Sequence, residues 1–401
     1  MNDTKEFDLI IWGASGFTGR LVAEYIFNKY GVGKTVNWAM GGRNQAKLEM
    51  VRAAVADETV PLVIADSQDE ASLEEMVKRT KVICSTVGPY AKYGSKLVAA
   101  CVNNQVDYCD LTGEAQWIRR MIDAHHDAAK ANGTKIVHTC GFDSIPSDLG
   151  VFFMQKEAQK RTGKPAKSIK MRVRGMSGGL SGGTFASMEN VMEEIAKDKS
   201  VYKVLTNPYS LNPEGEQSGP DKKDLQTVLY EEETKGWLAP FVMAGINTKV
   251  VRRSNALMNY AYGKDFRYDE AMMFKSRFKA IGVAMTLGIV FLGKPGSFYK
   301  KIINRFLPDP GEGPSKAERE AGFYKFHLYT TLSDDSKVLG IVTGDKDPGY
   351  GSTCKMLAES AICLAQDELS DISGVLTPST AMSDKLLKRL EENAGLTFSI
   401  V

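Results

Sequence analysis

FDLIIWGASGFTG, residues 7–19, is the stretch that decides how this chain begins to fold. Residues 7–12 are short and mostly apolar, which is typical of a buried strand. A G-x-x-G-x-x-G loop follows at 13–19, and the spacing of apolar residues over 21–26 then predicts an amphipathic helix that ends at Gly31. Strand, glycine loop and helix in this order predict a dinucleotide-binding βαβ unit, although such a loop also occurs as a structural turn in other α/β proteins.

The glycines of the loop have separate physical tasks. Gly13 allows a sharp turn, Gly16 allows a pyrophosphate to approach, and Gly19 allows the helix to pack on the strand. The free N–H groups and the positive dipole end of the helix then face the phosphates. We therefore predict that the cofactor contacts the whole loop: Gly13, Ala14, Ser15, Gly16, Phe17, Thr18 and Gly19.

The end of the second expected strand, 36–40, indicates which dinucleotide is bound. NAD-binding units carry an Asp or Glu near this point for the ribose 2′-OH. This sequence continues Gly41-Gly42-Arg43-Asn44 and has no acid there. Small residues leave room, and a guanidinium suits a 2′-phosphate. We predict NADP(H), with Gly42, Arg43 and Asn44 among its contacts; the alternative is that Arg43 is only a surface charge.

Further strands are expected at 61–65, 81–86, 106–110 and 135–140. Strand–helix alternation over about 150 residues predicts a parallel, doubly wound sheet. Ligands bind at the carboxyl ends of such strands. Asp66 could therefore contact the adenine, or be an ordinary loop acid, and we expect Val87, Gly88 and Pro89 to approach the nicotinamide.

Three residues near the expected nicotinamide position are candidate catalytic groups: Tyr90, Tyr93 and Asp143. A tyrosine hydroxyl could donate a hydrogen bond or a proton to a developing enolate. Asp143 could act as an acid only if burial raises its pKa. Each tyrosine could equally be a half-buried packing residue.

Several motifs occur together in order: GASGFTG at 13–19, GGRN at 41–44, STVGPYAKYG at 85–94, YCDLTGE at 108–114 and CGFDSIPSDLG at 140–150. Glycine motifs at 311–314, 349–351 and 374–378 extend the pattern over most of the chain. In these residues the chain resembles the saccharopine dehydrogenase-like oxidoreductases, a family with a branch of trans-acting enoyl reductases of lipid assembly. Residues 144–148 depart from the continuation found in the family's saccharopine reductases, which argues against saccharopine as the substrate.

The resemblance implies a Rossmann NADP(H)-binding domain with an inserted second domain. We expect the Rossmann domain at 1–150, an α+β domain for substrate binding and dimerisation at 151–348, and C-terminal helices at 349–401 that return to the first domain. Residues 177–184, SGGLSGGT, are expected to form a loop that is a lid, a phosphate cradle or a plain interdomain turn. Alternating runs on both sides of 333–336 predict a β-hairpin.

Composition excludes several classes of protein. The formal net charge is only +2 and no basic run contains interleaved aromatics, so we expect no nucleic-acid partner. The six cysteines form no C-x-x-C pair and the four histidines have no metal-binding spacing. We therefore expect no metal. The polar N-terminus without an apolar core and the expected free thiols predict a cytoplasmic location.

Residues 278–293, FKAIGVAMTLGIVFLG, form the most apolar stretch, and basic residues flank it. It is shorter than the ~20 residues that span a bilayer. Three interpretations remain open: a buried helix, the wall of an acyl-chain tunnel, or a surface that contacts lipid. The last interpretation would make the protein peripherally membrane-associated.

The leading hypothesis is an NADPH-dependent oxidoreductase that reduces a C=C (enoyl) or related group of a lipid-like acyl or other small-molecule substrate. A saccharopine-type amino- or imino-acid dehydrogenase is the alternative within enzymes, with Arg172 and Arg174 as candidate carboxylate clamps. A non-catalytic NADP(H)-binding protein of lipid surfaces is the alternative from another class. A homodimer is a further expectation.

Overall fold

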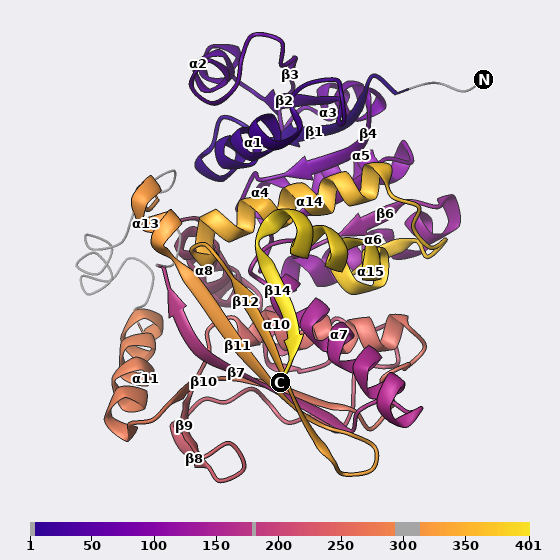
Figure 1. Cartoon of the computed structure of the whole chain (residues 1–401). Helices are drawn as coiled ribbons and strands as arrows, with labels where there is room; N and C mark the ends of the chain where they lie inside the picture. Colours follow the sequence, from indigo (N-terminus) through magenta and orange to yellow (C-terminus); the bar gives the residue numbers. More distant parts are fainter. Residues whose placement is uncertain (1–4, 179–181, 293–312) are drawn as a thin grey trace. The chain divides into compact units, whose positions relative to one another are not determined.

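The chain divides into two compact units, which we describe separately (Figure 1). The computed structural model describes residues 5–178, 182–292 and 313–401, with only the backbone described at 182–186, 188 and 290–292. Residues 179–181 of the predicted glycine-rich loop and 311–312 of the C-terminal motif lie outside the described residues. Unit 1 is Met1–Ile145, Gly311–Gly313 and Gly349–Ala394; unit 2 is Pro146–Pro310, Pro314–Pro348 and Gly395–Val401.

The domain boundaries that we expected from the sequence lie after residues 150 and 348. The chain leaves unit 1 at Ile145 and re-enters it at Gly349. Residues 395–401 belong to unit 2, because the strand at Leu396–Ile400 pairs antiparallel with the strand at Lys337–Gly344. The C-terminal helices pack in unit 1, where the helix at Thr353–Gln366 lies against the first helix and three central strands.

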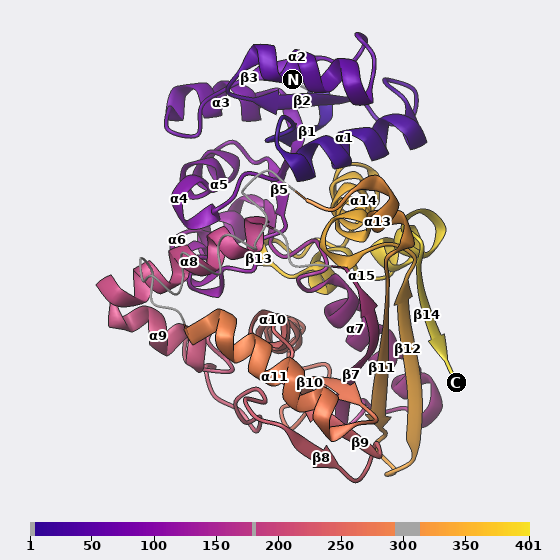
Figure 2. The same cartoon turned by 90° about the vertical axis from the view of Figure 1, so that its left-hand side faces the viewer.

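Unit 1 is built on a seven-stranded sheet in the order β13-β6-β5-β4-β1-β2-β3, with parallel pairing throughout. This confirms the predicted Rossmann sheet, whose order reverses between β1 and β4. Helices α1, α2, α14 and α15 cover one face, and α3, α5 and α6 cover the other (Figures 1 and 2). Its strands are β1 Phe7–Trp12, β2 Trp38–Gly42, β3 Leu62–Ile64, β4 Thr80–Ser85, β5 Asp107–Asp110, β6 Lys135–Val137 and β13 Gly374–Leu376. Its helices are α1 Phe17–Tyr30, α2 Gln45–Val55, α3 Glu70–Lys78, α4 Tyr90–Tyr93, α5 Ser95–Asn103, α6 Ala115–Asn132, α14 Thr353–Gln366 and α15 Pro378–Arg389, with π-helical turns at Pro348–Ser352 and Leu390–Ala394.

Local chemistry explains most of these boundaries. Gly31 ends α1 with a φ of 68°, and Gly133 ends α6 with a φ of 83°, a region in which glycine carries no side-chain penalty. The Asn44 side chain caps α2 by accepting from the Lys47 amide at 2.9 Å. Strand β6 stops earlier than predicted, because Thr139 adopts a φ of 64° and cannot continue the ladder.

Unit 2 is built on a mixed sheet in the order β14-β12-β11-β7-β10-β9-β8, in which only β7 and β10 pair parallel. The predicted hairpin is confirmed as β11 and β12, with Asp335 in the left-handed region at the turn. Its strands are β7 Ser168–Ser177, β8 Leu229–Glu231, β9 Gly236–Ala239, β10 Arg267–Phe274, β11 Phe323–Thr331, β12 Lys337–Gly344 and β14 Leu396–Ile400. Its helices are α7 Ile145–Thr162, α8 Gly182–Lys197, α9 Lys199–Thr206, α10 Ala244–Leu257, α11 Arg277–Leu292 and α13 Lys316–Ala321.

The core of unit 2 lies between the sheet and helices α7 and α10. Gly150 of α7 approaches Leu328 and Val342 so closely that an added Cβ would lie 3.2 Å from each side chain. Helix α10 packs on β10 and is buried along nearly its whole length. Helix α11 packs against β9 and β10, but its other face is exposed. Of the three interpretations left open for 278–293, the buried helix is contradicted by the described side chains, because Phe278 is 84% exposed and Met285 is 62% exposed.

Candidate functional site

The glycine loop joins the carboxyl ends of three neighbouring strands in unit 1. The amides of Gly13 and Ala14 donate to the Gly41 carbonyl at the end of β2, at 3.0 and 3.1 Å. On the other side, the Thr86 hydroxyl after β4 donates to the Trp12 and Gly13 carbonyls at 3.0 and 3.2 Å. The loop is therefore held between β2 and β4, at the point where the strand order reverses.

Two glycines of the loop are required by space and by backbone angle. Gly13 has a φ of 89°, and a Cβ there would lie 2.6 Å from the Val87 side chain. A Cβ at Gly19 would lie 2.2 Å from the Gly13 carbonyl oxygen, so α1 starts in direct backbone contact with the loop. The first turn of α1 contains no acidic residue, and its N-cap, Gly16, supplies no side-chain hydrogen bond. The first turn of α1 therefore places no carboxylate beside an anion at this helix end.

The β2 edge lacks an acid and offers a cation. Gly41 and Gly42 are buried, whereas Arg43 and Asn44 are exposed. In the part of the chain that the structure describes, Arg43 makes no ion pair. Asn44 caps α2. The guanidinium of Arg43, in contrast, is exposed and suits a phosphate at the strand end.

Asp66 lies one strand further along the same edge. Its preceding residue, Ala65, donates its amide to the Gly42 carbonyl at 3.2 Å. The Asp66 carboxylate accepts from the Gln68 amide at 2.9 Å and so shapes the turn before α3. The cap of α3 is Asp69, which accepts from the Ala71 amide at 3.1 Å. Asp66 thus has a local structural task beside its exposed position at the sheet edge.

A buried carboxylate holds the loop that follows β4. Glu114 is 2% exposed, and its two oxygens accept from the amides of Tyr90 at 2.8 Å and Ala91 at 3.0 Å. These amides begin the short helix α4, directly after Val87, Gly88 and the cis-linked Pro89. Glu114 therefore fixes the backbone that we expect to contact the nicotinamide.

A second buried carboxylate, Asp110, joins the ends of β5 and β6. Its oxygens accept from the Thr112 amide at 3.1 Å and the Thr139 amide at 3.2 Å. The Tyr108 hydroxyl donates to it at 3.0 Å, and the His138 Nδ1 atom lies 2.7 Å from it. Asp110 is thus tied to four groups and organises both strand ends.

The two candidate tyrosines have different surroundings. Tyr90 is buried, stacks on Trp117 and donates its hydroxyl to the Ser85 carbonyl at 3.1 Å. Burial, with the nearby Asp110 charge, raises the pKa of Tyr90 well above its usual value. Tyr93 lies at the other end of α4 and is 36% exposed. Tyr93 is therefore the more accessible residue of the two.

Asp143 lies in the turn between β6 and α7. The Ile145 amide closes this turn on the Gly141 carbonyl at 2.9 Å, and the Phe142 amide donates to the Thr353 hydroxyl at 3.0 Å. Burial and, to a lesser degree, the negative charge of Asp110 raise the pKa of Asp143 to about 7. Among the described side chains none hydrogen-bonds to the Asp143 carboxyl. The Asp143 carboxyl is therefore a candidate proton donor.

The residues of unit 1 fit NADP(H). The loop has no room for a side chain at Gly13 or Gly19, and the first turn of α1 contains no acidic residue. Arg43 lies at the end of β2, where a 2′-phosphate is expected. No pattern in the sequence indicates the tasks of Asp110 and Glu114, or the contacts that His138 and Thr139 make with Asp110. His138 was placed inside an expected strand, and only the left-handed backbone of Thr139 reveals that the strand has ended.

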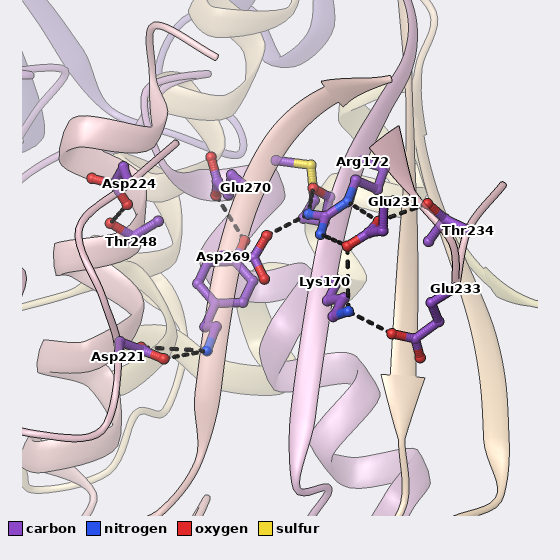
Figure 3. A network of polar contacts seen from close by, with 12 residues as sticks. Lys170, Arg172, Asp221, Asp224, Glu231, Glu233, Thr234, Thr248, Asp269 and Glu270 are labelled. Carbon is purple, nitrogen blue, oxygen red and sulfur yellow. Dashed lines mark hydrogen bonds and ion pairs between the residues drawn. The ribbon is translucent and has the colours of Figure 1, made fainter. Parts of the chain in front are cut away.

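The described part of unit 2 does not offer Arg172 as a clamp for substrate carboxylates. Its guanidinium is 1% exposed and donates to both Glu231 oxygens at 2.9 and 2.8 Å and to Asp269 at 2.6 Å (Figure 3). Lys170 and Thr234 bind the same Glu231. Glu231 and Asp269 already neutralise the Arg172 charge. This weakens the hypothesis that Arg172 binds a substrate carboxylate.

Two features are absent from the residues that the structure describes. No helix there is long and apolar enough to cross a membrane. No group of three or more His, Cys, Asp or Glu side chains in residues 5–178, 182–292 and 313–401 has the geometry to hold a metal ion.

Comparisons with known proteins identify the cofactor-binding domain and a set of relatives that match nearly the whole chain. Residues 9–137 match the model of the saccharopine dehydrogenase NADP-binding domain. A candidate trans-acting enoyl reductase of Mycobacterium tuberculosis (strain H37Rv) is 39% identical over 96% of this chain and 96% of its own length. A trans-acting enoyl reductase of Mycobacterium leprae is 36% identical, over 97% of this chain and 96% of its own.

The solved structures add the fold. Saccharopine dehydrogenase (L-Glu forming) from Saccharomyces cerevisiae superposes with a TM-score of 0.55 and covers 98% of this chain and 99% of its own. Only 11% of the residues are identical, so this likeness concerns the fold alone.

Proposed function

The chain belongs to the saccharopine dehydrogenase-like oxidoreductases, in the branch of the trans-acting enoyl reductases, and we propose that this NADP-dependent oxidoreductase reduces the C=C bond of a lipid-like acyl substrate. Two observations support the proposal. The relatives that match nearly the whole length are named trans-acting enoyl reductases. Unit 1 contains an acid, Asp143, that can supply a proton near neutral pH.

The observation that carries the chemistry is the environment of Asp143. Reduction of an enoyl group needs a hydride at the β-carbon and a proton at the α-carbon. The glycine loop and Arg43 would hold NADPH, which would supply the hydride and leave as NADP⁺. Asp143, with its pKa raised to about 7, donates the proton to the α-carbon and is left as a carboxylate, which solvent reprotonates. The C=C bond is consumed and two C–H bonds form.

The negative charge that develops on the acyl carbonyl needs a hydrogen-bond donor. We assign this task to the Tyr93 hydroxyl in preference to Tyr90, because Tyr90 already donates to the Ser85 carbonyl. Glu114 acts as a positioning residue, since it holds the amides that follow Pro89. The cofactor contacts proposed from the sequence are retained: the loop 13–19, residues 42–44, Asp66 and residues 87–89.

A lipid-like acyl substrate also favours a protein that works beside a membrane. We propose peripheral contact with lipid through the apolar helix α11.

We also propose that the protein assembles as a homodimer. Light scattering of the purified protein tests the dimer, because the measured mass distinguishes one copy of 44.0 kDa from two.

The function is tested by following NADPH oxidation with a series of trans-2-enoyl thioesters of increasing acyl length. We expect turnover that rises with chain length, and a product saturated at the α- and β-carbons. The corresponding saturated thioesters are the control and should consume no NADPH. Turnover only with a 2-oxoacid plus an amino acid would contradict the proposal and favour the amino-acid dehydrogenase.

A further inference from the structure

Helix α11 presents an apolar stripe to solvent. Phe278, Met285 and Ile289 are 84%, 62% and 48% exposed, and Gly282 between them is exposed as well. These positions follow each other at intervals of four, three and four, so they lie on one side of the helix. The opposite side, which includes the fully buried Ala280, packs against β9 and β10.

This arrangement differs from that of an ordinary surface helix. Such helices bury their apolar face and turn charged residues outward. Between residues 280 and 289, α11 has no charged side chain on either face. Isolated exposed apolar residues such as Met50 on α2, at 73%, are normal, but a continuous stripe indicates a surface that is covered in use.

The charged residues in the segment that contains the stripe, 271–289, are all positive. Lys275, Arg277 and Lys279 surround Phe278, and Lys275 and Lys279 are exposed. Arg277 is exposed as well, and its guanidinium lies 5.3 Å from the Trp237 ring centroid, so the two lysines are the exposed cations without this ring contact. The sequence contains no Asp or Glu between Glu270 and Asp309. Cations in the first turn of α11 oppose the helix dipole, so their position is not explained by helix stability.

We propose that α11 is a docking surface for an anionic lipid membrane. Its 16 residues extend over about 24 Å, which is too short to cross a bilayer but suits a helix that lies in the interface plane. The apolar stripe enters the acyl region, and Lys275 and Lys279 meet the lipid phosphates. The charge complementarity commits the surface to anionic lipid. The inference rests on the lipid contact of the proposed function and adds the class of lipid and the residues that bind it; flotation measures this binding separately from the reduction of the substrate.

The test is flotation of the full-length protein with vesicles of phosphatidylcholine alone or mixed with phosphatidylglycerol. The wild type should float with the mixed vesicles and much less with neutral ones. Phe278→Ser together with Met285→Ser should weaken binding to the mixed vesicles by at least about thirtyfold, because both side chains leave the acyl region. Lys275→Gln together with Lys279→Gln should weaken it by about thirtyfold, since each lysine contributes attraction to the anionic surface.

Met50→Ser is the matched control, because it removes an exposed apolar side chain from unit 1. It should float like the wild type. NADPH affinity measured on each variant reports folding and should not change. Equal flotation of the Phe278/Met285 variant and the wild type would overturn the proposal. Absence of wild-type binding to either vesicle would overturn it too and would favour an acidic protein as the occupant. If the Lys275/Lys279 variant floats like the wild type, the proposal that the surface binds anionic lipid is overturned.

Discussion

The two units treat buried charge differently. In unit 1, the carboxylates of Asp110 and Glu114 accept from backbone amides at the ends of strands, and these bonds shape the loops that surround the expected cofactor. In unit 2, Arg172 in the middle of β7 is neutralised by carboxylates from β8 and β10. The first pattern fixes the loops that follow the strands, whereas the second joins neighbouring strands within a sheet.

The largest expected effect tests the structural task of the unit 2 network. Arg172→Met leaves Glu231 and Asp269 without their buried cation, and we expect the free energy of unfolding to fall by about 3–5 kcal/mol. Urea denaturation followed by circular dichroism measures this. Lys170→Met is the control on the same strand; its side chain is 29% exposed, and the loss should stay within about 1 kcal/mol. Equal losses would remove the distinction between the two cations.

The second prediction concerns Asp143 in unit 1. Because its folded pKa is raised to about 7, the protonated form predominates below that pH, and kcat should fall as the pH rises through about 7. Asp143→Asn should lower kcat by about a hundredfold or more and abolish this pH dependence. The pH profile of the enoyl reduction provides the measurement. An unchanged profile in the variant would show that another group donates the proton.

The third prediction concerns the glycine loop. A Cβ at position 19 would lie 2.2 Å from a backbone oxygen that cannot move aside, so Gly19→Ala should lower the free energy of unfolding by about 2 kcal/mol and impair NADPH binding. Thermal denaturation with and without NADPH reports both effects. Gly245→Ala in α10 is the matched control, because nothing lies within 4 Å of its added Cβ, and it should be neutral or slightly stabilising. Similar behaviour of the two variants would argue against the close contact.

The smallest effect concerns the loop after β4. Glu114→Gln keeps the size of the side chain but replaces one of the two accepting oxygens by a donor, and it removes the charge. We expect NADPH to bind about tenfold more weakly, with the larger change in KM for NADPH than in kcat. Steady-state kinetics with varied NADPH concentration measure KM and kcat separately. A loss confined to protein stability would assign Glu114 a purely structural task.

Sequence alone could predict most of unit 1, because its signals are local. The glycines of the loop, Gly31 and Asn44 set turns and caps through their own backbone or side chain. The alternation of strands and helices then fixes a parallel sheet. The end of β6 was missed, because the left-handed Thr139 has a β-branched side chain that gives no turn signal.

The site and unit 2 could be predicted only in part, because their contacts join distant residues. Glu114 lies 24 positions from the Tyr90 amide, and Arg172 lies 97 positions from Asp269. No local pattern indicates that these groups meet. The apolar composition of α11 was visible in the sequence, but which side faces solvent depends on its packing against β9 and β10.

The most direct test of the account is a fluorescence titration of the wild type, Arg43→Ala and Lys34→Ala with NADPH and NADH. The exposed Lys34 lies before β2, at the strand's opposite end, and serves as the control. We predict tighter binding of NADPH than of NADH by the wild type. Arg43→Ala should weaken NADPH binding by about ten- to a hundredfold, with NADH unaffected, because a charge-assisted bond to the 2′-phosphate is lost. Equal affinity of the wild type for both nucleotides, or unchanged NADPH binding by Arg43→Ala, would contradict it.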